Sequence, residues 1–522
     1  MRKKVLAGLV ARGVLVEPDA LGYIMAQPKP LEYIEGYLGR QGQAPLFITL
    51  NDLKSGALQS EKVILRDGEI VIEKPAIEDK EATAPSLSME QKQLPIPTPP
   101  PRHLGKGGPK RKTGDAREFD ADISIIKDIT GQSRCSGKAS DFSHYFQSRF
   151  NALSRLLRQR PELASAVDIQ VAARYEREVA IIGMVREVKP PKPGGTKYTI
   201  MTLEDGTGAI SVLTKSEEEH ILNDEVIGVV GKVSSGRNGR FKEKAVFADR
   251  IVRPEIYGHR PRLGQRPLSA AFISDIHIGS KKFLPKAWEQ FAAWLRGDDP
   301  LARRVKYLVI AGDMVDGVGV FPSQEEELEI SNIIGQYEAL GKLLEGIPEH
   351  IEVIMLPGNH DGVRLSEPQP ALPAQLVKAI SAKATYVGNP CLMTLDGVRV
   401  LAYHGKGLDD YVGNVGKVSY AQPARIMAEM LKRRHLCPIY GGKTQISPER
   451  TDHLVIDTVP DIFVTGHIHA AAAQRYEGVL TINASTWQDQ TPFQAIHNIQ
   501  PDPGRVTVVD LDTSNYEVKR FY

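Results

Sequence analysis

The stretch that decides the fold reads Ala-Ala-Phe-Ile-Ser-Asp-Ile-His at residues 270–277. Its four apolar residues predict a buried strand, and a carboxylate and an imidazole stand where that strand ends. Asp275 and His277 are two residues apart, so on an extended segment both side chains point to the same face. A single polar pair of this kind is usually a turn, and its weight depends on the rest of the chain.

Four further polar stretches follow in chain order, each directly after an apolar run. They read Gly-Asp at 312–313, Gly-Asn-His-Asp at 358–361, Tyr-His-Gly at 403–405 and Gly-His-Ile-His at 466–469. We expect strands at 270–273, 307–311, 351–356, 398–403, 461–465, 479–482 and 506–511, and helices at 286–295, 326–344, 371–381 and 421–434. This alternation predicts an α/β layered fold over residues 268–522, with the polar loops gathered at strand ends.

Together the polar stretches carry the donor types of a metal site. Five of the 13 histidines lie in them, beside carboxylates and an asparagine amide. This mixture suits a pair of Mn²⁺, Fe or Zn²⁺ ions better than a thiolate zinc cluster. Two ions about 3.5–4 Å apart can activate a water and stabilise the oxygens of an in-line displacement. One carboxylate must bridge such a pair, and Asp313 is the candidate.

Composition sets limits on the class of protein. The 522 residues carry a formal net charge of +2, so overall charge does not indicate nucleic-acid binding. Cys135, Cys391 and Cys437 are too far apart for a disulfide framework, which fits a reducing compartment. The N-terminus briefly resembles a signal peptide until Arg12 interrupts it, and no apolar stretch reaches the roughly 20 residues that span a bilayer. We therefore expect a cytoplasmic protein without a membrane partner.

The N-terminal part of the chain carries no catalytic pattern. Residues 1–72 predict a small docking or structural module, with helical periodicity at 5–14 and 31–38. A hairpin is expected from two apolar runs at 62–65 and 69–72, which an Asp-Gly pair joins.

Two segments separate this module from the rest of the chain. Pro, Gly and basic residues dominate 73–118 and predict a disordered linker, a solvated tether whose basic end could also touch a nucleic-acid backbone. Residues 119–176 predict a helical segment whose apolar stripe is core. Its arginines, Arg149 among them, are expected to form a solvated face.

Residues 177–256 predict about five strands and hence a small β-barrel. The run Thr-Leu-Glu-Asp-Gly-Thr-Gly at 202–208 resembles that of an OB-fold, whose face commonly binds single strands. Tyr198 and Phe241 are the candidate stacking residues. Because aromatic residues are few on this face, a protein–protein role is somewhat favoured over strand binding.

The five polar stretches resemble the calcineurin-like metallophosphoesterase family, whose motifs are Asp-x-His, Gly-Asp, Gly-Asn-His-Asp/Glu, His and Gly-His-x-His. This sequence fills every position of that pattern. The resemblance implies one cation held by Asp275, His277, Asp313 and His469, and another held by Asp313, Asn359, His404 and His467. It also implies that His360 is not a ligand but a general acid for the leaving oxygen, oriented by the carboxylate of Asp316.

The order of the modules is similar to that in the small subunits of archaeal family D DNA polymerases. The resemblance is strongest from residue 179 onward and includes the stretches 141–146, 202–206 and 436–444. It implies a 3′→5′ exonuclease that removes mispaired nucleotides from DNA ends with two divalent cations, most readily Mn²⁺, with Mg²⁺, Fe or Zn²⁺ as alternatives. It also implies a large catalytic polymerase subunit as partner.

Two other functions stay open on the sequence. The chain could be a catalytically silent scaffold for the polymerase, or a protein or small-molecule phosphatase, because the metal motifs alone permit several substrates. The segment 405–460 is expected to form an insertion over the site. Within it, 407–411 and the basic run 432–435 would either guide a DNA end or contact the partner or solvent.

Overall fold

The structure is a computed structural model that describes residues 114–191, 197–215, 220–235, 244–496 and 499–522, with short elements before residue 74. The chain divides into two compact units, Met1–His103 and Leu104–Tyr522. None of the described helices has the length and apolar character needed to cross a membrane.

The N-terminal unit contains two small two-stranded sheets. Strands β1 (Leu15–Val16) and β2 (Phe47–Ile48) pair in parallel. Strands β3 (Lys62–Arg66) and β4 (Glu69–Glu73) form an antiparallel hairpin, which confirms the predicted one. The helix predicted at 5–14, and most of the one predicted at 31–38, lie outside the described residues.

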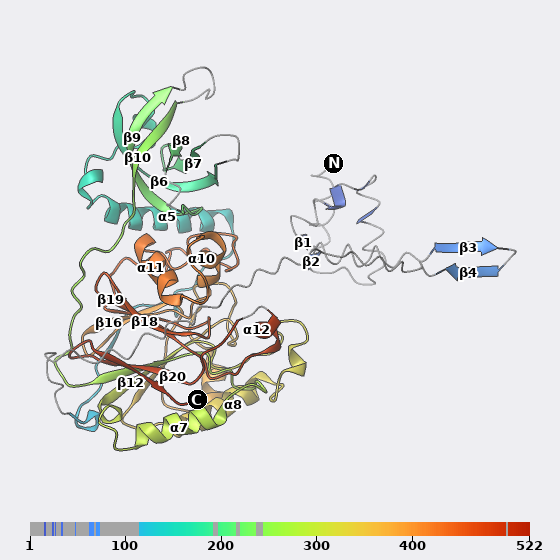
Figure 1. The fold of residues 1–522 in the computed structure, drawn as a ribbon, viewed down its shortest axis with the longest axis vertical. Coiled ribbons are helices and arrows are strands. Elements are labelled where there is room, and N and C mark those ends of the chain that lie inside the picture. Colours follow the sequence, from blue (N-terminus) through green and yellow to red (C-terminus); the bar gives the residue numbers. More distant parts are fainter. Residues whose placement is uncertain are drawn as a thin grey trace, which may run out of the picture. The chain divides into compact units, whose positions relative to one another are not determined.

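The second unit is built on two six-stranded sheets (Figure 1). Strands β11 to β14 of the first sheet are parallel, β20 runs antiparallel to them, and β21 pairs antiparallel with β20 and so runs in the direction of β11. In spatial order the sheet is β14 (Thr385–Tyr386), β13 (Glu352–Leu356), β12 (Val305–Ala311), β11 (Ser269–Ile273), β20 (Arg505–Asp510) and β21 (Tyr516–Arg520).

The second sheet is mixed, and one of its edge strands comes from before the barrel. Its order is β18 (Ala471–Tyr476), β19 (Val479–Ala484), β17 (Ile462–Thr465), β16 (Val398–Ala402), β15 (Cys391–Leu395) and β5 (Ile123–Lys127). Strand β5 lies in the segment predicted to be helical. Only Ile123 of this strand packs against the core, so the sequence shows no clear alternation there.

The two sheets pack face to face with helices on both outer sides (Figure 1). Apolar side chains of both sheets, among them Phe272 and Val464, fill the space between them. Helices α7 (Pro285–Arg296), α8 (Ile333–Leu344) and α9 (Ala374–Ile380) cover the first sheet, and α10 (Leu408–Asn414) and α11 (Pro423–Arg433) cover the second. The predicted α/β layered architecture is confirmed, and the segment 405–460 supplies one of its helical layers.

The helix predicted at 326–344 begins later than expected. A short 3₁₀ turn, η4 (Gln324–Glu326), precedes it, and α8 starts only after Asn332, whose side chain accepts a hydrogen bond from the Gly335 N–H at 2.6 Å. In a helix over this segment, Glu325 and Glu329 would lie four residues apart on one face, and their like charges would disfavour it. The start of α8 is therefore set by its N-cap residue and not by the apolar periodicity of the sequence.

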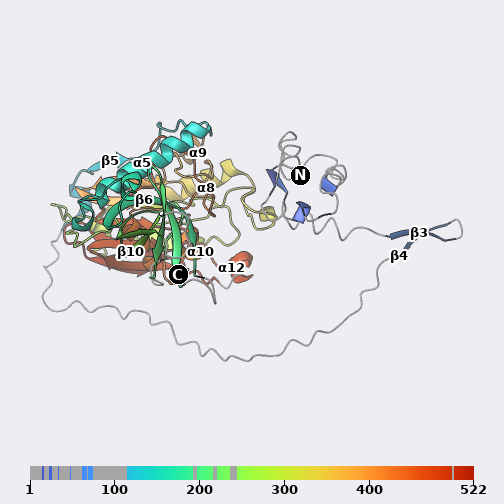
Figure 2. The same ribbon diagram turned by 90° about the horizontal axis from the view of Figure 1, so that it is seen from above.

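Five strands close the small barrel that the sequence predicts (Figure 2). They are β6 (Glu178–Lys189), β7 (Thr199–Glu204), β8 (Ala209–Thr214), β9 (Val226–Ser235) and β10 (Lys244–Val252), in the order β10-β8-β7-β6-β9. Only the β8–β10 pair is parallel among these described strands. Helix α5 (Ala139–Leu157) packs along β6 and β9, and α6 (Ile169–Ala172) and η2 (Pro161–Leu163) adjoin the barrel.

The folded part of the second unit reaches back into the predicted linker. Residues 116–118 form η1 (Ala116–Glu118) beside η3 (Ala302–Arg304), and Ala116 is buried between the sheets. The backbone N–H of Asp122 donates to the Tyr307 hydroxyl at 2.9 Å. The expectation of disorder is therefore wrong for residues 114–118, because one small apolar side chain ties them to the core.

Candidate metal centre

The predicted site residues lie at the strand ends where the two sheets meet. Loops after β11, β12 and β13 supply Asp275, His277, Asp313 and Asn359, and loops after β16 and β17 supply His404, His467 and His469. Carboxylate and imidazole atoms from these loops form three overlapping groups whose possible ligand atoms lie within 4.8 Å of one another. The fold thus brings all seven side chains into one cluster.

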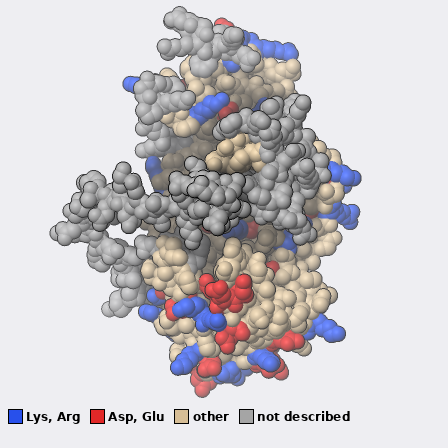
Figure 3. Space-filling model, turned by 90° about the vertical axis from the view of Figure 1, so that its right-hand side faces the viewer, with Lys and Arg blue, Asp and Glu red and all other residues tan. Residues whose placement is uncertain are grey.

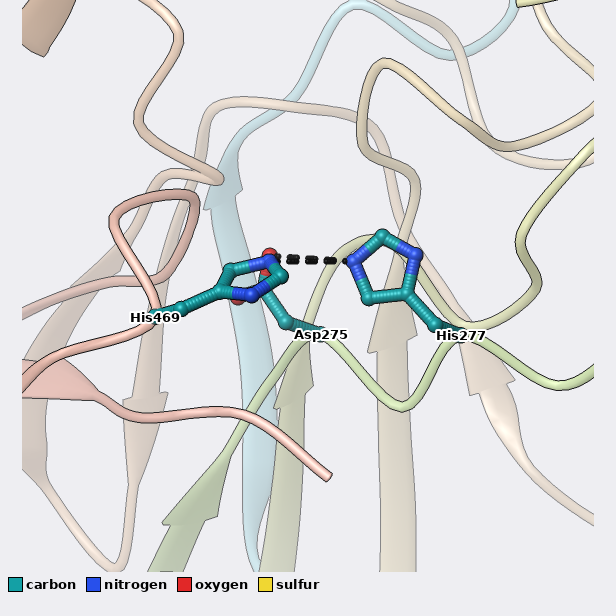
Figure 4. A group of neighbouring side chains, drawn as sticks. All are labelled: Asp275, His277 and His469. Atoms are coloured by element: carbon teal, nitrogen blue, oxygen red, sulfur yellow. Dashed lines mark hydrogen bonds and ion pairs between the residues drawn. The ribbon is translucent and has the colours of Figure 1, made fainter. Parts of the chain in front are cut away.

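The first group consists of Asp275, His277 and His469 (Figure 4). The Nε2 atoms of the two histidines are 3.1 Å apart. The Asp275 Oδ1 atom is 3.2 Å from Nε2 of His469 and 3.8 Å from Nε2 of His277. All three side chains are nearly inaccessible to solvent, so donor atoms face one another in a closed space.

The second group consists of Asp313, His404 and His467. Nε2 of His404 lies 3.2 Å from Asp313 Oδ2 and 3.1 Å from the amide oxygen of Asn359. The same Asp313 oxygen is 3.9 Å from His277 Nε2 in the first group. Asp313 therefore lies between the two groups, where a bridging carboxylate is required.

Hydrogen bonds on the far side of two rings fix which nitrogen faces the cluster. Nδ1 of His277 is 3.0 Å from the Asp316 carboxylate, and Nδ1 of His404 is 2.9 Å from the Ala311 carbonyl oxygen. Both partners only accept, so each Nδ1 carries a proton and each Nε2 is the nitrogen left to bind a cation.

These donors fit divalent cations. Lone pairs and carboxylate oxygens converge, and Asp275 Oδ1 is buried without a hydrogen-bond donor among the described residues. Burial lowers the pKa of His277, but the Asp275 and Asp316 carboxylates beside it raise the pKa to about 10 overall, so a cation bound at Nε2 would displace a proton from that nitrogen. The cluster thus favours positive charge, and imidazole, carboxylate and amide donors suit Mn²⁺, Fe or Zn²⁺.

The backbone at the cluster is left-handed at five of the seven predicted ligands. The φ angles are +52° at Asp275, +54° at His277, +49° at Asp313, +70° at His467 and +62° at His469. Such conformations cost about 1–3 kcal/mol each and gather at functional sites. The predicted extended segment at 275–277 is therefore wrong, and the two side chains meet through left-handed turns.

Three glycines allow the loops to approach the donors closely. A Cβ atom would lie 2.2 Å from Asp313 Oδ1 at Gly358, 2.3 Å from Asp275 Oδ2 at Gly466 and 2.4 Å from His404 Nδ1 at Gly312. The φ of Gly358 is not left-handed, so its backbone conformation alone does not require glycine. Close packing against Asp313 is what requires glycine there.

His360 and Asp316 lie beside the first group, in an arrangement that differs from the expected one. Nδ1 of His360 is 2.7 Å from the backbone carbonyl oxygen of Asp316, whereas the Asp316 carboxylate contacts His277, Gln324 and Gln488. Asp316 thus orients His360 through its main chain and His277 through its side chain. The sequence motif could not separate these two contacts.

Comparison with known proteins places the chain in a family. A family model for the B subunits of DNA polymerases alpha and epsilon matches residues 270–474, which include all seven cluster residues. The DNA polymerase II small subunit of Archaeoglobus fulgidus is 40% identical over 469 residues, 87% of this chain and 91% of that protein. The chain belongs to the archaeal DNA polymerase II small subunits. Members from Methanothermobacter thermautotrophicus and Thermoplasma acidophilum are 43% and 40% identical, over 75% and 74% of this chain and 82% and 79% of theirs.

The structure of this polymerase small subunit shows several residues that support the site and to which the sequence analysis assigned no role. Asp361 accepts hydrogen bonds from the backbone of Met314 and Gly358 at 3.2 and 2.8 Å, so it joins two of the donor loops. The Gln494 amide lies 2.8 Å from Nδ1 of His469. Asp361 belongs to the Gly-Asn-His-Asp motif and could have been inferred, whereas an isolated glutamine gives no sequence signal.

The basic run 432–435 of the polymerase small subunit does not form a surface that guides DNA. Arg433, Arg434 and His435 are buried. Arg433 pairs with Glu225 of the barrel at 3.2 Å, Arg434 binds backbone carbonyl groups, and His435 lies 2.9 Å from Asp452. The DNA-guiding alternative is wrong for these three residues, which instead hold the unit together.

Proposed function

We propose that this polymerase small subunit is a 3′→5′ exonuclease that removes nucleotides from DNA ends with two divalent cations. The observation that carries the proposal is the position of Asp313 between two groups of buried donors. Asp275, His277, Asp313 and His469 would hold one cation, and Asp313, Asn359, His404 and His467 the other. Mn²⁺ is the preferred cation, with Mg²⁺, Fe or Zn²⁺ as alternatives.

The residues of the chain divide the work between binding and proton transfer. When bound, two cations would activate a water and neutralise charge on the phosphate oxygens. His360 donates its Nδ1–H to the Asp316 carbonyl, so as an imidazolium it would give the proton on Nε2 to the leaving oxygen and become neutral. Asp316 keeps both His277 and His360 in place, the first through its carboxylate and the second through its backbone carbonyl.

Exposure indicates how a DNA end would enter. Asn359, His360 and His467 are partly exposed, whereas Asp275, Asp313 and His404 are almost completely buried. A phosphodiester would therefore approach from the side of Asn359 and His360. In the lower part of the face drawn in Figure 3, the described Lys and Arg side chains are interspersed with Asp and Glu.

We further propose that the barrel over 177–256 is an OB-fold and that residues 268–522 form a calcineurin-like metallophosphoesterase domain. The strand order of the barrel and its β8–β10 parallel pair support the first assignment. Tyr198 has its ring edge-on to Phe247 at 6.3 Å, and Phe241 lies outside the described residues. We assign the barrel to protein contact, with the large catalytic subunit of the polymerase as the partner.

A nuclease assay on a primer with a mismatched 3′ end tests the proposal, with and without the large subunit and across cations. We expect mononucleotide release that depends on Mn²⁺. Asn359→Ala and His360→Ala should lower the rate by roughly 10²–10⁴-fold, because a ligand or the general acid is lost. Asn151→Ala and His144→Ala change exposed residues of α5 and serve as matched controls.

Three results would contradict the proposal. Undiminished release by His360→Ala would remove its role in proton transfer. A protein that binds no Mn²⁺ at saturating concentration would instead be a scaffold subunit, and turnover of a phosphoprotein without any turnover of DNA would make it a phosphatase.

A further inference from the structure

His467 is held differently from the other histidines of the cluster. Its Nε2 atom lies 3.2 Å from Oδ2 of Asp409, on the first turn of α10. His277 and His404 have their Nδ1 atoms occupied by acceptors instead. The ring of His467 is thus fixed at the opposite nitrogen.

The chemistry of the partner decides the tautomer. An ionised carboxylate only accepts hydrogen bonds, so Nε2 of His467 carries the proton and Nδ1 has the lone pair. His467 belongs to the second group, with Asp313 and His404. Nδ1 is therefore the atom with which His467 can bind a cation, whereas His277 and His404 offer Nε2.

Asp409 is itself held in place by two further side chains. Lys406 Nζ lies 2.8 Å from its Oδ2 atom, and the Tyr420 hydroxyl donates to Oδ1 at 3.0 Å. The side chain of Asp409 is 14% exposed. The neighbouring Leu408 and Tyr411 of α10 are buried in the layer that covers the second sheet, so the helix backbone has a fixed position.

We propose that Asp409 is a positioning residue that holds His467 as an Nδ1 ligand of the cation shared with Asp313 and His404. Lys406 and Tyr420 keep the carboxylate in the required orientation. The inference rests on the proposed function only in requiring that cations bind at the cluster. It extends the site from the strand-end loops to α10, in the segment 405–460.

The arrangement gives each group one histidine that a carboxylate holds. Asp316 holds His277 in the first group through Nδ1, and Asp409 holds His467 in the second through Nε2. Removal of one carboxylate should therefore affect one cation and spare the other. Such selectivity separates positioning from a general loss of structure.

Cation binding without DNA tests the proposal on the full-length protein. Titration with Mn²⁺, followed by calorimetry and by the electron paramagnetic resonance of the bound ions, reports both sites. Asp409→Ala should lower the affinity for one of the two Mn²⁺ ions by roughly 10–100-fold. At intermediate Mn²⁺ concentrations the variant should then hold a single ion, whose resonance shows no magnetic coupling to a second one. Asp409→Asn, which retains an oxygen acceptor, should restore part of the affinity. Asn414→Ala, at the exposed end of the same helix α10, is the matched control.

A second measurement reads the tautomer directly. Long-range ¹H–¹⁵N spectra of histidine-labelled protein with Zn²⁺ bound should show the proton of His467 on Nε2 and those of His277 and His404 on Nδ1. A proton on Nδ1 of His467 would overturn the proposal. Unchanged affinities for both Mn²⁺ ions in Asp409→Ala would also overturn it. An equal loss of affinity for the two ions, in a variant with an unchanged unfolding midpoint, would do the same. Wild-type protein that binds two ions but degrades no DNA would overturn the exonuclease and leave this inference intact.

Discussion

Glu367 lies behind the metal cluster, not in it. Its carboxylate accepts from the Tyr403 hydroxyl at 2.7 Å and from the Asn389 amide at 3.4 Å. The Asn389 side chain in turn accepts from the His404 backbone N–H at 2.8 Å. Burial raises the pKa of Glu367 to about 7, although the Tyr403 hydrogen bond opposes this. Below about pH 7 a neutral acid thus supports the loop that carries His404.

The sign of the resulting pH effect follows from proton counting. Between about pH 4.5 and 7 the folded protein retains a proton on Glu367 that the unfolded chain has released, so stability falls as the pH rises through this window, by about 3 kcal/mol at most. Glu367→Gln stays neutral throughout. We expect its unfolding midpoint relative to wild type to be higher at pH 8 than at pH 5.

Unfolding midpoints of both proteins at the two pH values check this expectation. Glu338→Gln, on the exposed face of α8, is the control and should show no such change. A Glu367→Gln protein that loses stability relative to wild type as the pH rises would contradict the sign.

At the residue scale, the sequence identified which side chains lie close together. It did not predict the backbone conformations and hydrogen bonds that hold them there. Chain order and motif spacing were sufficient to bring Asp275, Asp313 and His404 together, because each follows a strand that could be recognised. Their roles as ligands stay predictions. The left-handed backbone and the two different contacts of Asp316 depend on packing against distant loops, which no local pattern encodes.

At the scale of elements, buried ion pairs join α5 and the barrel to the layers built on the two six-stranded sheets. Arg149 of α5 is fully buried, with Nε 2.7 Å from Asp452 and Nη2 2.8 Å from the Tyr145 hydroxyl. Glu225, just before β9, pairs with Arg253 at 2.6 Å and with Arg433 at 3.2 Å. The solvated face predicted for Arg149 is wrong, since this cation is enclosed between elements.

Arg149→Met tests how much this junction contributes. The substitution leaves Asp452 buried with less compensation, so the free energy of unfolding should fall by about 3–5 kcal/mol. Arg155→Met, on the exposed side of the same helix, should change it little. Denaturant unfolding and limited proteolysis measure both variants.

A double variant separates the charge from the packing at this junction. Arg149→Met with Asp452→Leu removes both charges and should recover much of the lost stability. No recovery would show that the hydrogen bonds of Arg149 to neighbouring backbone carbonyls dominate instead.

Elements with strong apolar runs were predictable, and those defined by partners were not. Strands β11, β12 and β13 are buried along nearly their whole length and appear as apolar runs in the sequence. Strand β5 exists because β15 offers an edge, and the start of α8 depends on the Asn332 cap. Both features come from tertiary contact or from a single side chain, which periodicity does not report.

For the whole molecule, the predicted ligands come from both sheets, so cation binding and sheet packing are linked. Chelation of the cations should lower the unfolding midpoint, by a free energy of about 2.7 kcal/mol for each ion present at 100 times its Kd. Asp275→Ala should reduce this sensitivity, because one donor is lost. Thermal scans with and without chelator measure it, and equal midpoints would exclude the linkage.

The spread of the donors along the chain has a consequence for how the protein is made. Asp275 leaves the ribosome long before His467 and His469, and the backbone N–H of Trp487 still has to bind the Asp275 carbonyl at 2.9 Å. A nascent or truncated chain that ends before residue 467 contains all five strands of the barrel but lacks two donors of the cluster. Under the proposed function, synthesis would deliver the polymerase-binding part first and the capacity to degrade DNA last.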